Sequence, residues 1–416
     1  MKISRLKLKN IKCFKDIDIS FEDESGEIKN WSLFVGNNGN GKTTILRCLA
    51  LGLCDQGSAS GLLLELFGEY IRRGEEEGII EVNLKGDDGK LYTIQTSIVG
   101  DNESVSRKIL KFNEDEISEK DIEREKIFAA AYGAGRSITG IESYDQYAIV
   151  DAVYPLFNYR HTLQNAELGA SRVKIYSDTE WKKLEKTLKK ILLFHEDDKI
   201  SFGKTGLYVE RGKGNEMFNS LSDGYQSLTS VILDFVGWNL LYREEEDFEI
   251  NNLSGIFIID ELEQHLHPKW QREIVKILSE QFPKVQFLGS THTPICALGL
   301  SDLDSGSCLI KTTYENGHSD VEKFDLREDF KGYRADQILT SGIFDLTDSR
   351  SISIENKLKT YSEIYLKEES KRSSQDKETL RVIEDELKNL PMWGNVKEKQ
   401  LWEKLIDEFE RARILE

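Results

Sequence analysis

Cysteine is scarce in this chain, and the few cysteines present form no metal-binding pattern. The chain has 416 residues and five cysteines, none in a CxxC pair: Cys13, Cys48, Cys54, Cys296 and Cys308. An odd, dispersed set in a chain of this length indicates reduced thiols rather than a disulfide framework. His265 and His267 suggest a zinc site, but no cysteine or further histidine lies nearby, so zinc is not expected.

Long apolar runs are also missing. No segment approaches the roughly 18 apolar residues that a membrane span needs. The segment Met1–Asn10 has charges at every second or third position and no apolar h-region, so it does not read as a signal peptide. Glycine and proline are too few to suggest extensive disorder, and a hydrophobic fraction of 39% supports a substantial core. We therefore expect a soluble, cytoplasmic protein with no membrane partner.

Positive charge is in deficit. The chain has 56 Lys and Arg against 74 Asp and Glu, for a net charge of −18. This balance excludes a surface that is basic throughout, so any DNA contact requires a local basic patch or a partner protein. The length allows two or three domains, or one large domain with an appendage.

The pattern of apolar residues predicts alternating strands and helices. Residues 2–22 alternate as antiparallel strands do, and residues 78–98 predict a hairpin around Gly86–Gly89. The highly charged segment 108–124 fits either a loop or a short helix. Further strands are expected at 32–35, 127–132, 199–211, 255–259 and 285–290, and helices at 44–52, 143–193, 222–242, 268–282 and beyond 347.

The segment Gly36–Thr43 matches the P-loop pattern GxxxxGKT and stands between a predicted strand and a predicted helix. Its glycines allow backbone N–H groups to surround a phosphate, and the helix adds its positive amino-terminal end. Lys42 is expected to reach the β- and γ-phosphates, and the Thr43 hydroxyl to bind Mg²⁺. The predicted nucleotide-binding residues of this loop are Asn38, Gly39, Asn40, Gly41, Lys42, Thr43 and Thr44.

Four apolar residues, Ile256–Ile259, end in two carboxylates, which is the Walker B pattern. We expect Asp260 to bind Mg²⁺, directly or through water, and Glu261 to orient and polarise the attacking water. His292 follows the next predicted strand, from where an imidazole can hydrogen-bond the γ-phosphate or that water. Glu261, His292 and Lys42 are therefore the predicted catalytic residues.

The segment Leu221–Ser227 lies between the two Walker motifs and resembles the signature motif of ABC-type ATPases. It places Ser222, Asp223 and Gly224 where a helix begins, so the Ser222 hydroxyl and the Gly224 N–H can face an anion. ABC-type ATPases use this motif to close over a nucleotide held by another subunit. The resemblance therefore implies a head-to-tail dimer in which each chain supplies half of two sites.

Three segments resemble the ABC-class ATPase heads of the SMC, RecF and OLD group: Ile3–Phe14, Gly36–Thr44 and Asp260–Pro268. The third is similar to the DE-x-E-x-HLHP run of prokaryotic members. Ala130–Arg136 and Leu163–Glu167 resemble the compact ATPases of anti-phage operons, most of all the PtuA ATPases of Septu systems and their retron-associated relatives.

The resemblance implies an α/β fold with an ABC-type ATPase head over residues 1–345. This head would contain a P-loop sheet, an antiparallel β subdomain and a helical lobe at about 143–242 that includes the signature motif. Residues 346–416 would form a C-terminal helical region that binds a partner. Its Leu380–Ile406 segment supplies apolar side chains that either anchor this partner or cover the chain's own core.

The sequence also departs from the family pattern. The signature contains Ser-Asp-Gly-Tyr-Gln in place of Ser-Gly-Gly-Gln, and no Q-loop glutamine follows the strand 127–132. The loop Gly133–Arg136 takes that place, so Arg136 is expected to contact phosphate or the opposite subunit. Lys12 stands where related heads keep a basic residue near the nucleotide.

The function implied is that of an ATP- and Mg²⁺-dependent regulatory ATPase that controls a separate nuclease, with an HNH subunit like PtuB expected. Any contact with DNA or a phage component would run through that complex. The roughly 70 residues after Phe344 are too few for a TOPRIM domain and contain no histidine, so no nuclease site is expected in this chain. The alternatives are a RecF-like DNA repair ATPase and an AriA-like ATPase of the PARIS system with a TOPRIM partner. A transporter subunit is disfavoured by the run after Walker B and the missing Q-loop.

Overall fold

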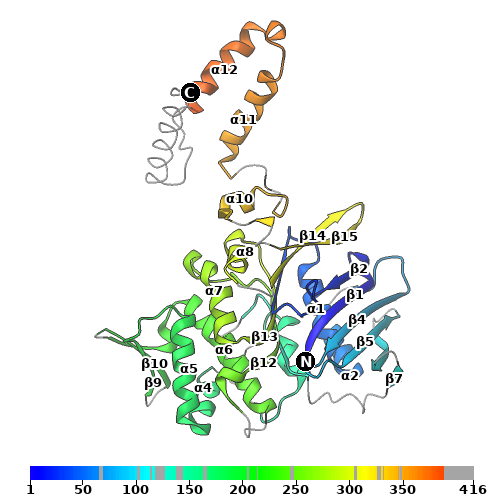
Figure 1. The fold of residues 1–416 in the computed structure, drawn as a ribbon, viewed down its shortest axis with the longest axis vertical. Helices are drawn as coiled ribbons and strands as arrows, with labels where there is room; N and C mark the ends of the chain where they lie inside the picture. Colours follow the sequence, from blue (N-terminus) through cyan, green and yellow to red (C-terminus); the bar gives the residue numbers. More distant parts are fainter. Residues whose placement is uncertain are drawn as a thin grey trace. The chain divides into compact units, whose positions relative to one another are not determined.

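The structure is a computed structural model of the chain. It describes residues 1–64, 69–100, 104–112, 115–117, 127–136, 144–161, 163, 166–203, 206–212, 214–243, 248–303, 307–325, 329–330, 332–344, 346 and 349–387. The chain divides into two compact units, Met1–Asp345 and Leu346–Glu416. Figure 1 shows the first unit as a mixed α/β fold built on one large sheet.

The centre of the first unit is a block of parallel strands. In spatial order these are β14 (Ser307–Glu315), β3 (Trp31–Val35), β13 (Lys284–Ser290), β12 (Ser254–Ile259) and β8 (Ala129–Tyr132). Their registers align Phe34 with Ser290 and Ile259 with Tyr132. The carboxyl ends of β3, β12 and β13 therefore meet at one edge of the sheet, which is where α/β sheets usually bind ligands.

Helices bury both faces of these strands. Ile256 and Ile258 pack in the same apolar cluster as helix α1 (Lys42–Leu53). Phe257 and Ile259 point to the other face, into the cluster formed with α6 (Asp223–Tyr242) and α7 (Pro268–Gln281). Burial on both sides explains why β12 reads as a continuous apolar run rather than an alternating one.

The remaining helices of the first unit continue these two layers. Within the described residues they are α2 (Gln56–Leu64), α3 (Ile149–Val153), α4 (Ala166–Tyr176), α5 (Asp178–Ile191), α8 (Pro294–Ser301) and α10 (Ala335–Leu339), with single 3-10 turns η2 (Tyr154–Leu156), η3 (Phe218–Ser220) and η4 (Ile250–Asn252). Among the helices of the described ranges, none is both long enough and apolar enough to cross a membrane.

Antiparallel strands extend the sheet on one side. They are β1 (Lys2–Ile11), β2 (Phe14–Ser20), β4 (Glu77–Lys85), β5 (Leu91–Val99), β6 (Ser104–Phe112), β7 (Asp115–Ile117) and β15 (His318–Phe324). The order of the twelve strands is β7-β6-β5-β4-β1-β2-β15-β14-β3-β13-β12-β8. β15 is antiparallel to β14 but joins β2 in parallel, through the single pair Ser319 with Phe14.

The interpretation of residues 108–124 as a loop or short helix is wrong for its first part. Residues 108–112 belong to β6, which pairs antiparallel with β5, and 115–117 form β7. Val105 and Leu110 are buried, and Lys108 donates hydrogen bonds to the carbonyl oxygens of Leu51 and Gly52, so strand pairing outweighs local composition. The rest of that segment lies outside the described residues.

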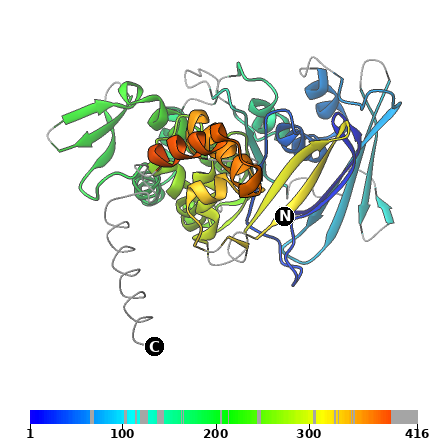
Figure 2. The same ribbon diagram turned by 90° about the horizontal axis from the view of Figure 1, so that it is seen from above.

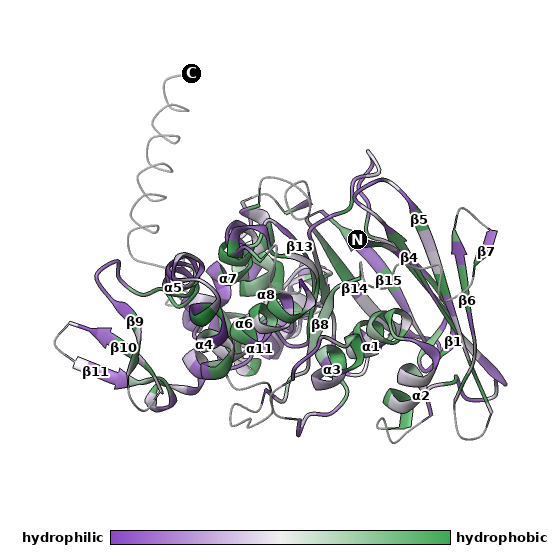
Figure 3. Cartoon of the chain, turned by 90° about the horizontal axis from the view of Figure 1, so that it is seen from below, coloured by the Kyte–Doolittle hydropathy of each residue, from purple (hydrophilic) through white to green (hydrophobic). Residues whose placement is uncertain are grey.

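A separate three-stranded sheet, β9 (Lys199–Gly203), β10 (Gly206–Arg211) and β11 (Gly214–Met217), projects from the helical side. Figure 2 shows this green sheet at one side of the first unit and the blue N-terminal strands at the other. It is largely hydrophilic in Figure 3, whereas α6 is largely hydrophobic. Among its residues, Leu207 and Val209 are buried against the main core.

In its described part, the second unit contains α11 (Ile352–Tyr365), the turn η5 (Glu369–Lys371) and α12 (Ser374–Leu387). Tyr361 donates a 3.0 Å hydrogen bond to Glu384, and Lys357 forms an ion pair with Glu386. Ile364, Leu380 and Ile383 are buried, so Leu380 is not an exposed anchor. The other predicted anchors lie outside the described residues: the side chain of Leu387, and Leu390, Trp393, Leu401, Trp402 and Leu405.

Candidate active site

The loop between β3 and α1 depends on its glycines. Gly36, Gly39 and Gly41 have φ angles of 138°, 84° and 99°, a region that other residues rarely adopt. A methyl group added at Gly41 would lie 2.4 Å from the ring of Phe14 and 2.8 Å from the sulfur of Cys13. Asn40 holds the loop by donating a 2.8 Å hydrogen bond to the carbonyl oxygen of Thr312. Asn38 and Gly39 are exposed at the loop tip.

Lys42 begins α1 and turns back over this loop. Its ammonium group donates hydrogen bonds to the carbonyl oxygens of Gly36, at 2.7 Å, and Asn37, at 3.0 Å. Burial lowers the pKa of Lys42 to about 8, although the nearby carboxylates of Asp260 and Glu261 partly oppose this shift. The ammonium group is therefore held among neutral backbone oxygens, which an anionic ligand can replace as stronger hydrogen-bond acceptors.

Thr43 and Asp260 lie together although 217 residues separate them in the chain. The Thr43 hydroxyl donates a 2.8 Å hydrogen bond to Oδ2 of Asp260, and the Ser290 hydroxyl donates one to Oδ1. Ser290 is the last residue of β13, and its role was not predicted. These contacts place one hydroxyl and one carboxylate side by side at the edge of the sheet, next to the P-loop.

Glu261 stands just beyond β12 in an uncommon backbone conformation. Its φ angle is 49°, in the left-handed region. Its N–H donates a 2.9 Å hydrogen bond to the Ser290 hydroxyl. Among the described residues, no hydrogen bond to its carboxylate is found, and the residue is only partly buried. The carboxylate is therefore available as a hydrogen-bond acceptor for a small molecule at the edge of the sheet.

Arg136 lies behind this loop rather than on the surface. It is 7% exposed, and its Nη2 donates to the carbonyl oxygens of Asp260, at 3.0 Å, and Glu261, at 2.8 Å. Burial lowers the pKa of Arg136 to about 10, so the side chain stays charged at neutral pH. What the structure shows is a backbone contact, and contact with phosphate or another subunit stays a prediction.

His292 is exposed, and a carboxylate that was not predicted holds its backbone. The N–H of His292 donates a 2.6 Å hydrogen bond to Oε1 of Glu263. Glu263 also raises the pKa values of Lys42 and Arg136 through its charge, against the larger effect of burial. The run Asp260-Glu261-Leu262-Glu263 contains the signal for this residue, because a third carboxylate at the end of a buried strand is unusual.

The signature segment begins α6. Ser222 is the N-cap residue, and Ser222 and Asp223 are both exposed, with no side-chain hydrogen bond at the cap. Gly224 packs tightly: an added methyl group would lie 2.4 Å from the carbonyl oxygen of His265. The helix start therefore has its hydroxyl and N–H groups open to an incoming anion while its other side is fixed on the loop after Walker B.

Lys12 sits at the turn between β1 and β2, with a φ angle of 45°. Its ammonium group lies 4.4 Å from the centre of the Tyr70 ring, a cation–π contact. The next residue, Cys13, packs on Gly41 as described above. This turn is thus beside the P-loop, and direct contact of Lys12 with a nucleotide stays a prediction.

The two histidines considered for zinc have structural surroundings. His267 caps α7, since its Nδ1 accepts a 3.3 Å hydrogen bond from the N–H of Lys269. His265 adopts a φ angle of 63° in the loop against Gly224. Within the described ranges, no group of three or more His, Cys, Asp or Glu side chains is placed to hold a metal ion.

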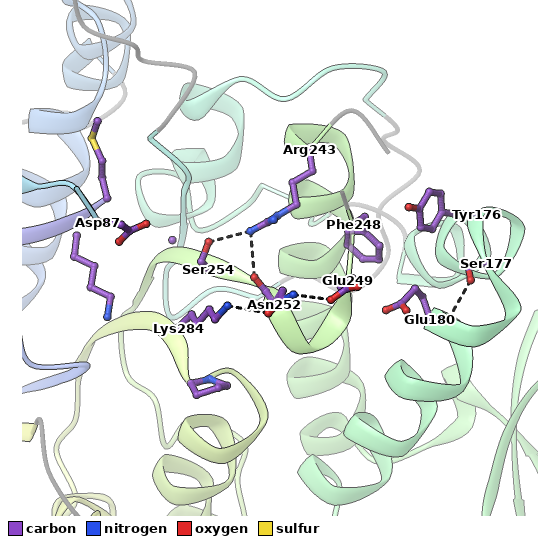
Figure 4. Close-up of a pocket in the computed structure, with 14 residues that line it drawn as sticks. Asp87, Tyr176, Ser177, Glu180, Arg243, Phe248, Glu249, Asn252, Ser254 and Lys284 are labelled. Carbon is purple, nitrogen blue, oxygen red and sulfur yellow. Dashed lines mark hydrogen bonds between the residues drawn. The ribbon is translucent and has the colours of Figure 1, made fainter. Parts of the chain in front are cut away.

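A hollow of about 1010 Å³ lies at the opposite ends of the strands, where β12 and β13 begin. Figure 4 shows that Arg243, Glu249 and Lys284 surround it, and that Asn252 is bonded to all three. Charged side chains of both signs thus share hydrogen bonds with Asn252. This hollow lacks the glycine loop and helix start that characterise the edge near Thr43.

Comparisons with known proteins agree with this geometry. The profile of the AAA domain family matches residues 5–218. The chain is 26% identical over 410 residues to the Septu protein PtuA of Bacillus mycoides (strain KBAB4), covering 97% of this chain and 53% of that protein. It is 37% identical over 87 residues to the Retron Vc95 probable ATPase of Vibrio cholerae serotype O1 biovar El Tor, covering 21% of this chain and 16% of that protein.

The fold also has a solved counterpart. The structure of an SMC head bound to the C-winged helix domain of ScpA covers 80% of this chain and all of that chain, with a TM-score of 0.53 and 14% identity. The α/β fold expected from the resemblance is therefore confirmed, as is the resemblance to SMC-type heads and PtuA proteins. The chain spans about half the length of the PtuA relative from Bacillus mycoides and a smaller share of the retron protein.

Proposed function

Because this chain belongs to the AAA domain family, we propose that it is an ATPase that binds ATP with Mg²⁺ and hydrolyses it to ADP and phosphate. The observation that carries the proposal is the 2.8 Å hydrogen bond between Thr43 and Asp260. It joins the first turn of the helix after a P-loop to the carboxylate at the end of the neighbouring strand. Lys42 lies beside them, and this residue is buried, so its ammonium group is largely shielded from water.

In this proposal the loop holds the phosphates. Backbone N–H groups of the glycine loop and the start of α1 face the β-phosphate. Lys42 exchanges its bonds to the carbonyl oxygens of Gly36 and Asn37 for bonds to the β- and γ-phosphates. The loop residues that surround the nucleotide are Asn38, Gly39, Asn40, Gly41, Lys42, Thr43 and Thr44, with Lys12 proposed nearby. Arg136 lies behind them, on the backbone of Asp260 and Glu261.

The oxygen atoms of Thr43 and Asp260 suit Mg²⁺, which prefers hard oxygen ligands and binds proteins through one or two carboxylates plus substrate phosphates. Their 2.8 Å separation fits two neighbouring positions around one small ion. When bound, the ion would neutralise negative charge on the phosphates. Ser290 would keep the carboxylate oriented by its hydrogen bond to the other oxygen.

Hydrolysis then needs a water aligned with the γ-phosphorus. The Glu261 carboxylate orients this water and accepts its proton while the new P–O bond forms and the bond to the β–γ bridging oxygen breaks. The imidazole of His292 donates a hydrogen bond to a γ-phosphate oxygen, where negative charge accumulates. The products are ADP and inorganic phosphate. Turnover is proposed to be slow, as suits a regulatory ATPase.

We further propose that two chains form a head-to-tail dimer around two ATP molecules, within an assembly of two or more copies. Support comes from the exposed start of α6, where Ser222, Asp223 and Gly224 present a hydroxyl and N–H groups without an internal partner at the cap. A γ-phosphate held by the P-loop of the second copy would complete this anion site. ATP would then be part of the interface, and both active sites would close together.

The biological role proposed is regulation of an anti-phage defence complex of the PtuA type. The match to a Septu PtuA protein over 97% of the chain supports it. Residues 1–345 would be the ATPase head, with its helical lobe at about 143–242. Residues 346–416 would hold a separate nuclease subunit, which we propose to be of the HNH type. Any contact with DNA or a phage component would then pass through the complex.

The direct test is ATP hydrolysis by the purified chain with Mg²⁺. The release of inorganic phosphate is measured for the wild type and for Glu261→Gln. Turnover in the wild type and its loss in Glu261→Gln are expected. Co-expression with candidate HNH subunits, with and without ATP, tests the partner separately. A wild-type chain that binds no nucleotide would contradict the proposal, and recovery without any nuclease would remove only the partner assignment.

A further inference from the structure

Arg136 is a buried cation with only backbone partners among the described residues. Its Nη2 reaches the carbonyl oxygens of Asp260 and Glu261, at 3.0 and 2.8 Å. Its Nε and Nη1 are buried, and no described residue accepts a hydrogen bond from them. Burying a guanidinium costs free energy that these two hydrogen bonds only partly offset. A residue kept at such a cost suggests a role in the site that it touches.

The peptide that Arg136 touches is the one that sets the direction of Glu261. A left-handed conformation costs a residue other than glycine roughly 1–2 kcal/mol, so neighbouring groups must hold it. Ser290 binds the N–H of Glu261, at 2.9 Å, and Arg136 binds its carbonyl oxygen. Within the described residues, these are the side chains that fix the Glu261 peptide on both sides.

From this arrangement we propose that Arg136 is a positioning residue for ATP hydrolysis, an inference that rests on the proposed function. Its guanidinium holds the backbone of Asp260 and Glu261 so that the Glu261 carboxylate faces the attacking water. In this role Arg136 touches neither the nucleotide nor the water. It acts through the carbonyl oxygens alone.

The loop that carries Arg136 is itself fixed. A methyl group added at Gly135 would lie 2.3 Å from the carbonyl oxygen of Tyr159, and one at Gly133 would lie 2.8 Å from that of Pro155. This close backbone packing leaves the loop little freedom to move toward a phosphate. Both hydrogen bonds come from one nitrogen, Nη2, whose two N–H groups each meet one carbonyl oxygen. The ammonium group of lysine is a compact, strongly hydrated charge on a different stem, so lysine is not expected to reproduce this arrangement.

Arg243 offers a matched control at the other end of the same strand. Its Nη2 donates to the carbonyl oxygen of Asn252, at 3.2 Å, and to the hydroxyl of Ser254, at 3.0 Å, and no described residue accepts a hydrogen bond from its buried Nε. Figure 4 shows this arginine reaching the start of β12. Arg136, which that figure does not include, binds the carbonyl oxygens just past the end of the strand. Both arginines donate hydrogen bonds at an end of β12, but only Arg136 contacts Glu261.

The experiment compares wild type, Arg136→Ala, Arg136→Lys, Arg243→Ala and Glu261→Gln for kcat, KM, ATP affinity and thermal stability. We expect Arg136→Ala and Arg136→Lys to lower kcat by about 100-fold, the scale of a 1 Å misplacement. KM and ATP affinity should stay within about threefold, because a positioning residue makes no contact with ATP. Arg243→Ala should change stability but leave kcat within about twofold.

Chemical rescue separates positioning from folding. Guanidinium chloride at a low, non-denaturing concentration should raise the kcat of Arg136→Ala at least about tenfold, compared with the same variant at matched ionic strength. The same addition should not help Glu261→Gln or Arg243→Ala. Where Arg136→Ala does not fold, the kcat of Arg136→Lys decides.

Three results overturn the inference. One is a kcat within twofold of wild type in the folded Arg136 variants. Another is a tenfold or larger loss of ATP affinity, which indicates phosphate contact. The third is an equal loss of kcat in Arg243→Ala, which indicates general damage to β12. Failure of the proposed function looks different, because the wild type itself would then hydrolyse no ATP.

Discussion

The hydroxyl of Tyr132 donates a 2.7 Å hydrogen bond to Asp234, and both residues are buried. Tyr132 ends β8, and its carbonyl oxygen accepts a 2.8 Å hydrogen bond from the N–H of Asp260. Asp234 belongs to α6, the helix that starts after Ser222. Burial, reinforced by the charge of Asp234, raises the pKa of Tyr132 well above its ordinary value, so the phenol remains a donor. One buried pair thus connects the end of the Walker B strand with the signature helix.

Replacing Tyr132 by Phe removes this donor and leaves the buried Asp234 carboxylate with one hydrogen bond fewer. We expect the free energy of unfolding to fall by roughly 1–3 kcal/mol. Urea denaturation measures the change. Tyr314→Phe is the control, because Tyr314 is 54% exposed and its hydroxyl loss should matter by less than about 0.5 kcal/mol. Equal midpoints for the two variants would contradict a stabilising role for the pair.

Glu261→Gln tests the proposed base. The amide keeps the size of the side chain but cannot accept a proton, so kcat should fall at least about 100-fold while ATP still binds. Unhydrolysed ATP should then trap the dimer, which light scattering after gel filtration detects. Glu280→Gln, the same change at an exposed position of α7, should behave like wild type. Hydrolysis at the normal rate in Glu261→Gln would exclude this residue as the base.

The lowered pKa of Lys42, about 8 against the usual 10.5, predicts a pH dependence of ATP binding. The ammonium form binds phosphate, so affinity should weaken as pH rises through 8, by about tenfold at pH 9. Titrations of ATP between pH 6.5 and pH 9.5 measure this. Lys42→Ala should bind ATP more weakly at every pH and lose this dependence. An unchanged wild-type affinity across the range would show that Lys42 does not carry the effect.

Stability should respond to the same group with the opposite sign. Between pH 8 and pH 10.5 the unfolded chain binds more protons at Lys42 than the folded chain does. The free energy of unfolding contributed by Lys42 therefore increases with pH in that window and is constant below it. Denaturation of wild type and Lys42→Met at pH 7.5 and pH 10 isolates this contribution, because methionine has no titrating group.

Gly224→Ala and Gly61→Ala should have opposite effects, although both glycines lie in helices. At Gly224 the new methyl group meets the His265 carbonyl oxygen at 2.4 Å, so we expect a loss of about 1–3 kcal/mol. At Gly61, in α2, no described atom beyond the neighbouring helix backbone lies within 4 Å of an added methyl group, so alanine should stabilise the helix by about 0.5–1 kcal/mol. Thermal denaturation of both variants measures the difference. A stable Gly224→Ala variant would mean that the signature segment is less closely packed than described.

The sequence was sufficient to predict the strands and helices around the site, because their patterns are local. The strand Ile256–Ile259, the P-loop and the helix after Ser222 each follow from spacing within about twenty residues. The charged strand β6 was missed, since a charged segment resembles a loop and the pairing of β6 with β5 is not visible in the local sequence. Strands β14 and β15 carried no prediction.

Contacts between distant segments could not be predicted in the same way. Ser290 lies 30 residues from Asp260, and Arg136 lies 125 residues from Glu261, so no local periodicity brings them together. Arg136 was noticed because it replaces an expected glutamine, but its backbone partners depend on how β8 and β12 pair. The register of those two strands brings the loop of Arg136 next to the carbonyl oxygens of Asp260 and Glu261.

Between Ser319 and Phe14 a single pair joins β15 to β2, which makes the sheet look divisible at this point. Phe14 belongs to the antiparallel strands, yet its ring is also the surface on which Gly41 rests. Deleting the antiparallel strands to obtain a minimal ATPase would therefore take away one wall of the phosphate loop. The smallest autonomous nucleotide-binding fragment has to include both halves of the sheet, although the sequence motifs lie almost entirely in one of them.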